Sequence, residues 1–306
     1  MPDALLVFEG AHGARLAVCR ADEVAREAAR RHDLAPGSAA ALAQALAGTL
    51  LLADSDPDQS RVDLHLTCPG PVLAVLTDAD ARGAARGFVR ATDLEIDGKP
   101  SRESKARMPP AATRFDAKPI LATRHDEVAG SLSIVRAAER GELHRTAFPF
   151  AGADLGAALT LHLRNDRPGG GEMALEVLLR EGEPLAAVAG VLLSSEDDSE
   201  EMSALGKPLR QRVLREALRA DEDAHRLADR IAAELQLGPL RLRTEMRPRF
   251  HCRCSRPRVE RALRILGPVE LRDMADRDGG ATARCDFCAT TYRLTRDELL
   301  DLARAV

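Results

Sequence analysis

The sequence predicts an α+β protein with an N-terminal domain of mixed helices and sheet, a helical linker and a small cysteine-rich C-terminal module. Three observations lead to this prediction. Several short segments alternate apolar and polar residues with the period of a strand, and others repeat apolar residues with the period of a helix. Four of the six cysteines lie in the last fifth of the chain. A chain of 306 residues also exceeds the usual length of one domain.

The N-terminal domain, predicted at residues 1–195, begins with two helices. Residues 21–31 and 38–53 have helical composition, and Ser38 is suited to cap the second helix after the Pro36-Gly37 pair. Alternation with period two, bounded by turn residues, then predicts strands at residues 61–68, 71–78, 85–91, 130–136, 173–180 and 185–194. Two further segments complete the domain, a helix at 154–164 and a proline-rich loop at 97–119.

The linker is predicted at residues 196–249. It follows an acidic, turn-forming stretch and contains two amphipathic helices. Their apolar stripes include Leu205, Leu209 and Val213 in the first helix, and Leu227 and Ile231 in the second. Two short helices cannot be strongly stable by packing on each other alone, so we expect these residues to dock on the α+β domain. A helical linker of this kind is metastable because its folding depends on that docking.

Composition narrows the classes of function. A net charge of -4 argues against a general nucleic-acid binder or a binder of anionic membranes. The N-terminal residues MPDALLVFEG show no signal peptide, and the apolar run from Ala39 to Ala53 is expected to be too short to span a bilayer. We therefore expect a cytoplasmic protein. In that reducing compartment clustered cysteines indicate metal or redox chemistry.

The C-terminal module, predicted at residues 250–306, contains such a cluster. Cys252 and Cys254 form a CxC pair, and Cys285 and Cys288 form a CxxC pair. Zn²⁺ takes four thiolates tetrahedrally at about 2.3 Å, and CxxC is a common half-site, so we expect all four cysteines to bind one zinc ion rather than iron. Structural zinc contributes about 10–16 kcal/mol in small modules. Removing it should unfold a module with so few large apolar residues.

The backbone of the module is predicted in the same way. Ser255 is suited to cap a helix that runs to Leu266, and a short helix follows Gly267-Pro268 and ends near Ala275. A hairpin carries the CDFC turn, with its return strand at 290–294. Its final helix is predicted from a capping box, formed by Thr295 and Glu298.

Two other functions are open at this point. One is a zinc ribbon that binds RNA or ribosomes, but residues 251–306 contain 11 Arg and 9 Asp or Glu, so no overall positive charge remains once four thiolates hold zinc. The other is a thiol-disulfide oxidoreductase, but CDFC lacks the strand-then-helix setting of such an active site. Cys19 and Cys68 are expected in the core without a redox role. His251 is expected to be exposed or beside the site, because four thiolates already complete it.

The module sequence CRCSRPRVERALRILGPVELRDMADRDGGATARCDFC resembles the zinc-binding, redox-sensing end of the redox-regulated holdase chaperones, the thirty-three-kilodalton heat-shock family. The stretch VDLHLTCPGPVLAVLTDADARGAARGFVR is similar to the family's early sheet, and EPLAAVAGVLLSS resembles the strand that closes its N-terminal domain. The resemblance covers nearly the whole chain. The chain departs from the family at LHLRNDRPGGGEM, where the family usually has an aromatic pair and Ser-Glu-Gln.

The resemblance implies an ATP-independent holdase that is not an enzyme and is inactive while reduced and zinc-bound. Under oxidative stress, disulfides Cys252–Cys254 and Cys285–Cys288 would form and zinc would leave. The linker would then undock and expose apolar surface to unfolding client proteins. The oxidised form is expected to be able to pair as a homodimer, and neither a membrane nor a nucleic-acid partner is expected.

Overall fold

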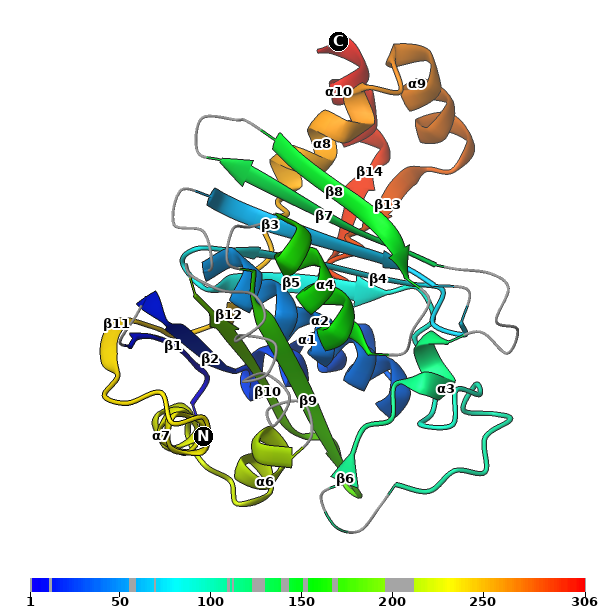
Figure 1. The fold of residues 1–306 in the computed structure, drawn as a ribbon. Helices are drawn as coiled ribbons and strands as arrows, with labels where there is room; N and C mark the ends of the chain where they lie inside the picture. The colour runs from blue at the N-terminus through cyan, green and yellow to red at the C-terminus, as the bar shows by residue number, and fades with distance from the viewer. Residues whose placement is uncertain are drawn as a thin grey trace. The chain divides into compact units, whose positions relative to one another are not determined.

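The computed structural model describes residues 2–10, 13–54, 59–68, 70–108, 111, 113–122, 130–138, 143–150, 154–166, 170–195 and 212–305. The chain divides into two compact units, Met1–His251 and Cys252–Val306. The first unit contains two six-stranded sheets with helices, and the second contains a two-stranded sheet with helices (Figure 1). This mixture of helices and sheets confirms the predicted fold class.

The first unit is built around two helices, α1 (Asp22–His32) and α2 (Pro36–Asp54). Pro36 lies in the first turn of α2, where the missing N–H of proline leaves no helical hydrogen bond unmade. The helix therefore begins before Ser38, and the predicted Ser38 cap is wrong. The Ser38 hydroxyl instead donates to one backbone group and accepts from another in the segment 91–94.

Helix α2 is long and apolar enough to cross a bilayer, so the expectation that its apolar run is too short was wrong. Its most apolar stretch is 94% buried inside the protein, and the helix packs against strands of both large sheets. The apolar character of α2 is therefore accounted for by its place in the core of the first unit.

The first sheet has the strand order β11-β1-β2-β10-β9-β6. Strands β9 and β10 lie within two residues of their predicted ranges, whereas β1 and β2 were not predicted. Both missed strands are covered on two faces, so they are continuously apolar and show no alternation. The bounds of the strands are β1 Ala4–Glu9, β2 Arg15–Arg20, β6 Thr113–Arg114, β9 Glu172–Arg180, β10 Glu183–Ser194 and β11 Arg241–Met246.

The second sheet has the order β12-β5-β4-β3-β7-β8. Strand β4 begins three residues later than predicted because the backbone N–H of Leu73 donates to the oxygen of Gly70 and closes a turn. Strand β8 was missed because it is a largely exposed strand at the edge of the sheet and contains Pro149. The bounds are β3 Gln59–Thr67, β4 Ala74–Asp80, β5 Ala84–Val89, β7 Gly130–Ala138, β8 Leu143–Phe150 and β12 Arg249–Phe250.

Two shorter helices complete this part of the unit, α3 (Lys118–Leu121) and α4 (Leu155–Asp166). The departure LHLRND forms the last turns of α4 and takes part in a polar network. The carboxylate of Asp166 accepts from Arg136 of β7 at 2.6 Å, and the His162 ring lies 3.2 Å from the Thr146 hydroxyl of β8. These contacts tie α4 to the second sheet.

Helices α6 (Leu214–Arg219) and α7 (Ala224–Glu234) lie in the predicted linker. Their apolar side chains form one cluster with the face of β1 and β2 that carries Leu6, Phe8, Leu16 and Val18. In this cluster Val213, Leu227 and Ile231 are buried. Leu205 and Leu209 lie outside the described residues.

A buried charge also reaches the linker. Arg20, at the end of β2, is only 2% exposed and forms an ion pair with Asp22 at 2.5 Å. Its guanidinium also donates to the backbone oxygen of Glu222 and lies 3.8 Å from the carboxylate of Asp221. Because a buried charge is costly without partners, the turn between α6 and α7 helps to satisfy Arg20.

The end of the predicted linker is not helical. Strand β11 pairs antiparallel with β1 at the edge of the first sheet, and β12 pairs parallel with β5 in the second. The sequence RLRTEM of β11 does alternate between polar and apolar residues, but this strand was missed because the whole linker was predicted to be helical. The two strands fix the chain immediately before the second unit.

The second unit contains α8 (Arg256–Arg264), α9 (Pro268–Arg277), the hairpin β13 (Gly280–Arg284) and β14 (Thr291–Thr295), and α10 (Arg296–Arg304). These elements were all expected, and the capping box of α10 has both of its hydrogen bonds. The predicted cap of α8 was wrong, because the Ser255 side chain forms no capping hydrogen bond, and the helix ends at Arg264 rather than at Leu266. The buried apolar core of this unit is small: Leu271, Ala275, Leu294, Leu299, Leu302 and Ala303.

Asp3 connects the N-terminal segment to α1. Its carboxylate accepts the backbone N–H groups of Glu23 and Val24 at 2.8 Å each, and so satisfies donors that the first turn of a helix leaves free. Burial raises the pKa of Asp3 to about 6, outweighing these hydrogen bonds, which favour the ionised form. Between about pH 4 and pH 6 the folded chain therefore keeps the Asp3 carboxyl protonated. In the unfolded chain the same carboxyl has a pKa of about 3.9 and is ionised in this range.

This difference predicts a pH dependence of stability. The contribution of Asp3 is fully present below about pH 4 and is lost as the pH rises through about 6. Relative to an Asp3→Asn variant, which cannot titrate, the parent's free energy of unfolding should fall by about 2 kcal/mol between pH 4 and pH 7. Urea unfolding of both proteins at the two pH values measures this. A constant difference between them would contradict the assignment.

Candidate metal centre

Two turns of the second unit carry the four clustered cysteines. Cys252 and Cys254 lie in the irregular segment between β12 and α8, and Cys285 and Cys288 lie in the turn that joins β13 to β14. In that turn the backbone N–H of Cys285 donates to the oxygen of Thr290 at 2.9 Å, which closes the hairpin around the CxxC pair.

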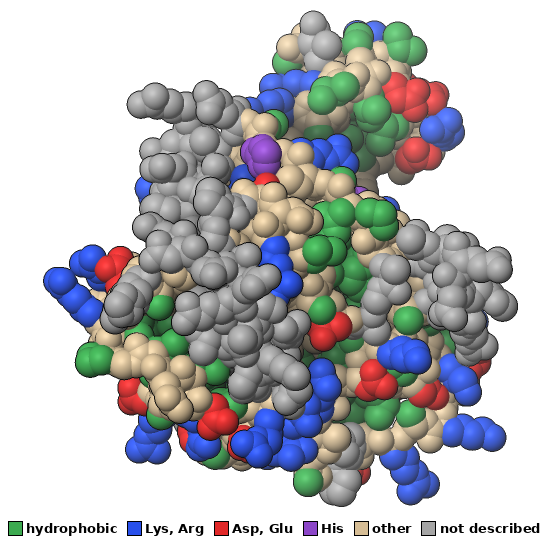
Figure 2. All heavy atoms as spheres, viewed as in Figure 1, with side chains coloured by type: hydrophobic (Ala, Val, Ile, Leu, Met, Phe, Trp, Pro, Cys, Tyr) green, Lys and Arg blue, Asp and Glu red, His purple; other side chains and the backbone are tan. Residues whose placement is uncertain are grey.

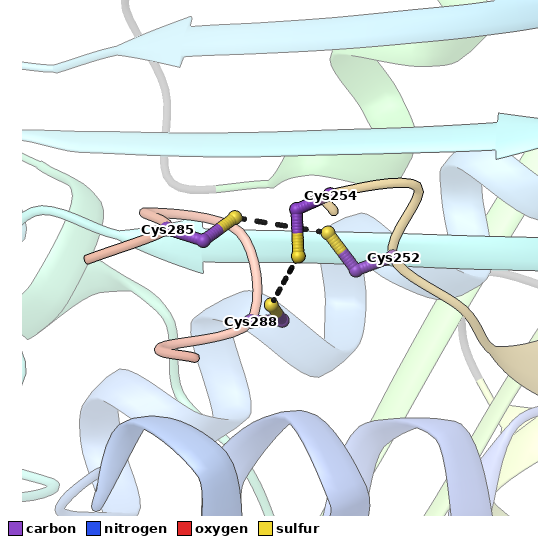
Figure 3. A group of neighbouring side chains, drawn as sticks. All are labelled: Cys252, Cys254, Cys285 and Cys288. Carbon is purple, nitrogen blue, oxygen red and sulfur yellow. Dashed lines mark hydrogen bonds between the residues drawn. The ribbon is translucent and has the colours of Figure 1, made fainter. Parts of the chain in front are cut away.

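The four sulfur atoms point toward one another (Figure 3). All of them lie within 4.8 Å of one another. Two contacts cross between the two pairs, 3.7 Å from Cys252 to Cys285 and 3.3 Å from Cys254 to Cys288. All four are free thiols. Residues more than 30 positions apart in sequence thus form one sulfur cluster.

Two hydroxyl groups contact this cluster, one from Tyr292 in β14 and one from Thr290 just before that strand. The Tyr292 hydroxyl donates to the sulfur of Cys254 at 3.1 Å, and the Thr290 hydroxyl lies 3.2 Å from the sulfur of Cys288. The contact with Cys254 raises the pKa of Tyr292 to about 12, so the phenol keeps its proton as a donor. Sequence reasoning missed both residues. Their spacing of two, which places them on one side of a strand next to CxxC, could have indicated them.

The thiols of the cluster differ in acidity. Burial raises the pKa of Cys285 to about 12, and burial also raises the pKa of Cys254. At Cys288 burial is outweighed by hydrogen bonds from Thr290 and from Cys254 and Cys252, which lower the pKa to about 7. Cys254 and Cys285 therefore keep their protons at neutral pH until a cation displaces them. A metal bound here would hold more tightly as the pH rises.

The donor set fits zinc. Four sulfurs at about 2.3 Å from a tetrahedral Zn²⁺ lie about 3.8 Å apart, close to the 3.7 Å between Cys252 and Cys285. Soft thiolates select zinc over hard cations such as magnesium and calcium. Within the described residues no other group of histidine, cysteine or acidic side chains meets the geometry for a metal ion. The arrangement can hold one metal ion, or release thiols for oxidation.

The other predicted residues lie apart from this cluster. His251 is exposed in the first unit, and its backbone N–H pairs with β5. Cys19 and Cys68 are buried in the core of the first unit. Burial raises the pKa of both thiols, to about 11 for Cys68, so they remain protonated and unreactive.

Comparison with known proteins decides the family. The model of the Hsp33 protein family matches residues 3–295. The chain belongs to the Hsp33 family. It is 31% identical to the 33 kDa chaperonin of Nostoc punctiforme over 99% of this chain and 96% of that protein. It is 26% identical to the 33 kDa chaperonin of Listeria monocytogenes over 97% of this chain and 96% of that protein.

A solved structure supports the fold. The 33 kDa chaperonin from Thermotoga maritima aligns with a TM-score of 0.80 over 99% of this chain and 98% of its own, at 21% identity. The resemblance drawn from the sequence is thereby confirmed, and the chain is a member of a family of chaperones. No enzyme class is associated with these names.

The ligand set predicts how the protein responds to cysteine replacement. The reduced, metal-free chain should bind one Zn²⁺, whereas Cys254→Ser or Cys285→Ser should weaken binding by orders of magnitude because a thiolate ligand is lost. Cys19→Ser is the matched control and should leave binding unchanged. Competition with a chromophoric chelator measures the affinity. Equal affinities in the control and the ligand variants would exclude this site.

Tyr292 is predicted to support the site without binding the metal. Tyr292→Phe removes the hydroxyl that donates to Cys254, and loss of a hydrogen bond to a ligand typically costs about 10–100-fold in metal affinity. The variant should still bind one Zn²⁺, about tenfold more weakly. An unchanged affinity, or a lost binding stoichiometry, would show that the hydroxyl does not have this role.

Proposed function

We propose that this protein is a redox-regulated, ATP-independent holdase that binds unfolding proteins under oxidative stress in the cytoplasm. The observation that carries the proposal is the cluster of four free thiols in a member of the Hsp33 family. Bound zinc would hold four thiolates in one tetrahedral site and so add folding energy to the second unit. With so small a buried core, the unit should unfold without it.

The cysteines act as the sensor. We assign disulfides to Cys252–Cys254 and Cys285–Cys288, each formed when two thiols pass two electrons and two protons to one peroxide, which leaves as two water molecules. In the folded cluster, sulfur contacts of 3.7 Å and 3.3 Å join the other pairs, Cys252 with Cys285 and Cys254 with Cys288. A CxC disulfide also requires a bent backbone, because extended Cα atoms two residues apart are about 7 Å from each other. Oxidation within each pair is therefore coupled to distortion of the folded unit.

In the proposed mechanism the linker covers the apolar surface that binds client proteins. Helices α6 and α7 have 6 and 11 residues, too few to be stable alone in water. Their folding therefore depends on one apolar face of the first sheet, where α6 packs on β9 and β10 and α7 packs on β1 and β2. Cys252 follows β12 after one residue, so unfolding of the second unit removes the anchor at the end of the linker. Release of α6 and α7 would expose this face to client proteins or to a second oxidised copy of the chain.

The two other functions lose support from the same geometry. The CxxC pair lies in the turn of a hairpin, without the following helix that an oxidoreductase of the thioredoxin type uses. Holding an unfolded client is a binding function without a chemical step, so the proposed function requires no acidic or basic side chain as a catalytic residue. An RNA-binding ribbon would be active in the reduced, metal-bound state, whereas the proposed holdase would be active after oxidation. An activity assay in both redox states therefore distinguishes the two functions.

The function is tested by client aggregation. Peroxide-treated protein should suppress the light scattering of a thermally unfolding client, reduced protein should not, and zinc release should precede the activity. A variant with serine at all four clustered positions should not respond to peroxide, whereas Cys19→Ser should respond like the parent. Activity that is the same in the reduced and oxidised proteins would contradict redox control. Absence of activity in both would contradict the holdase.

Release of the linker should activate the protein without oxidant. Ile231 is 0% exposed on α7, and burying a charge there costs several kcal/mol, roughly what a short docked segment can gain. Reduced Ile231→Asp protein should therefore suppress aggregation and bind an apolar dye more strongly than the parent, with its zinc retained. His225→Asp, on the exposed face of α7, is the control and should change neither. If the linker becomes protease-sensitive and no activity appears, the covered face is not the client site.

A further inference from the structure

The corner between α8 and α9 carries exposed apolar side chains. Ile265 is 85% exposed, Val269 is 75% exposed and Leu266 is 51% exposed. Three of the seven exposed large hydrophobic residues of the described chain thus lie within five consecutive positions. Single exposed apolar residues are normal on protein surfaces, but a group of them marks an interaction site. Side chains this exposed form a knob rather than a groove.

Arginines flank this knob. Arg258 and Arg261 are exposed, and with Ile265 they are spaced three and four residues apart, which places all three on one face of the α8 chain segment. Arg264 and Arg272 are also exposed nearby. None of these four arginines forms an ion pair with the described residues. Like charges three residues apart repel one another and destabilise a helix. The spacing of the arginines is therefore not explained by the stability of α8.

Several other arginines of the unit form ion pairs. Arg277 pairs with Asp273, Arg296 with Asp276 and Arg304 with Asp301. Of the acidic residues nearest the knob, Glu260 pairs with Arg256, and Glu270 is exposed beside Val269 as a single negative charge. Charged side chains of both signs are interspersed on the face of the protein drawn in Figure 2. The unpaired arginines of α8 are therefore a local excess of positive charge that the net charge of -4 does not reveal.

We propose that this surface, Arg258, Arg261, Arg264, Ile265, Leu266 and Val269, docks on an anionic lipid bilayer. Guanidinium groups bind phosphate with two parallel hydrogen bonds, and the apolar knob can enter the boundary between headgroups and acyl chains. A bilayer adapts to the knob, and the basic residues beside it match the negative surface of the lipids.

The surface should belong to the metal-bound state. Helix α8 contains no buried residue, so its position depends on the rest of the small second unit. If oxidation unfolds that unit, as the proposed function holds, the knob and the arginine face are lost together. The reduced protein would then rest at the membrane surface and leave it on oxidation. Membrane binding by the reduced protein does not depend on the holdase activity and is tested separately.

Vesicle sedimentation tests the proposal with the full, reduced, zinc-loaded chain. It should bind phosphatidylcholine vesicles that contain about one-third phosphatidylglycerol, and should not bind phosphatidylcholine alone. The triple variant Arg258→Gln/Arg261→Gln/Arg264→Gln should lose at least about tenfold in partition coefficient. Arg277→Gln/Arg296→Gln/Arg304→Gln changes the net charge equally at paired positions and should bind like the parent. Ile265→Ser/Val269→Ser should also weaken binding and leave the zinc content unchanged.

Several results would overturn the proposal. Absence of binding to the anionic vesicles at low salt is the first, and equal loss in the two arginine triples is the second, because net charge alone would then explain it. Unchanged binding in Ile265→Ser/Val269→Ser would exclude insertion of the knob. If the α8 triple loses binding to heparin and neither protein binds vesicles, the surface recognises a soluble polyanion instead of a bilayer.

Discussion

Four sulfur atoms within 4.8 Å of one another are the constraint on which the second unit depends. Such a cluster can be neutral with protons, compensated by a cation or converted to disulfides, but four thiolates cannot stay together uncompensated because like charges repel. The hairpin that carries Cys285 and Cys288 and the segment that carries Cys252 and Cys254 have only a small buried core to hold them. Under the proposed function, the chemical state of the sulfurs would therefore decide whether this unit is folded.

The folding of the linker depends in a similar way on a small set of contacts. The side chains of α6 and α7 bury an apolar face of the first sheet, α6 on β9 and β10 and α7 on β1 and β2. Arg20 places a buried charge against the turn between the two helices. Each contact is favourable only while the helices are folded, and the helices are folded only while docked. Strand β12 ends at Phe250, so in the chain only His251 separates it from Cys252.

Much of the fold and of the cysteine site could be predicted from the sequence, because local sequence patterns determine these features. The spacing of the cysteines, the alternation in β3 and the capping box of α10 each depend on neighbouring residues. Strands β1 and β2 could not be predicted in this way, since burial on both faces removes the alternation that identifies a strand. Strand β11 was concealed because its pairing partner lies more than 230 residues earlier. The spacing of Tyr292 from the CxxC pair could have indicated it, but its contact with Cys254 joins residues 38 positions apart and is seen only in the structure.

The central claim is that the state of the four thiols controls the docking of the linker. Backbone hydrogen exchange of residues 212–234, measured in the reduced zinc-bound protein and in the peroxide-treated metal-free protein, tests this most directly. We predict that protection of α6 and α7 is lost on oxidation while β9 and β10 remain protected. Equal protection of α6 and α7 in both states, with zinc released and the disulfides formed, would contradict the account.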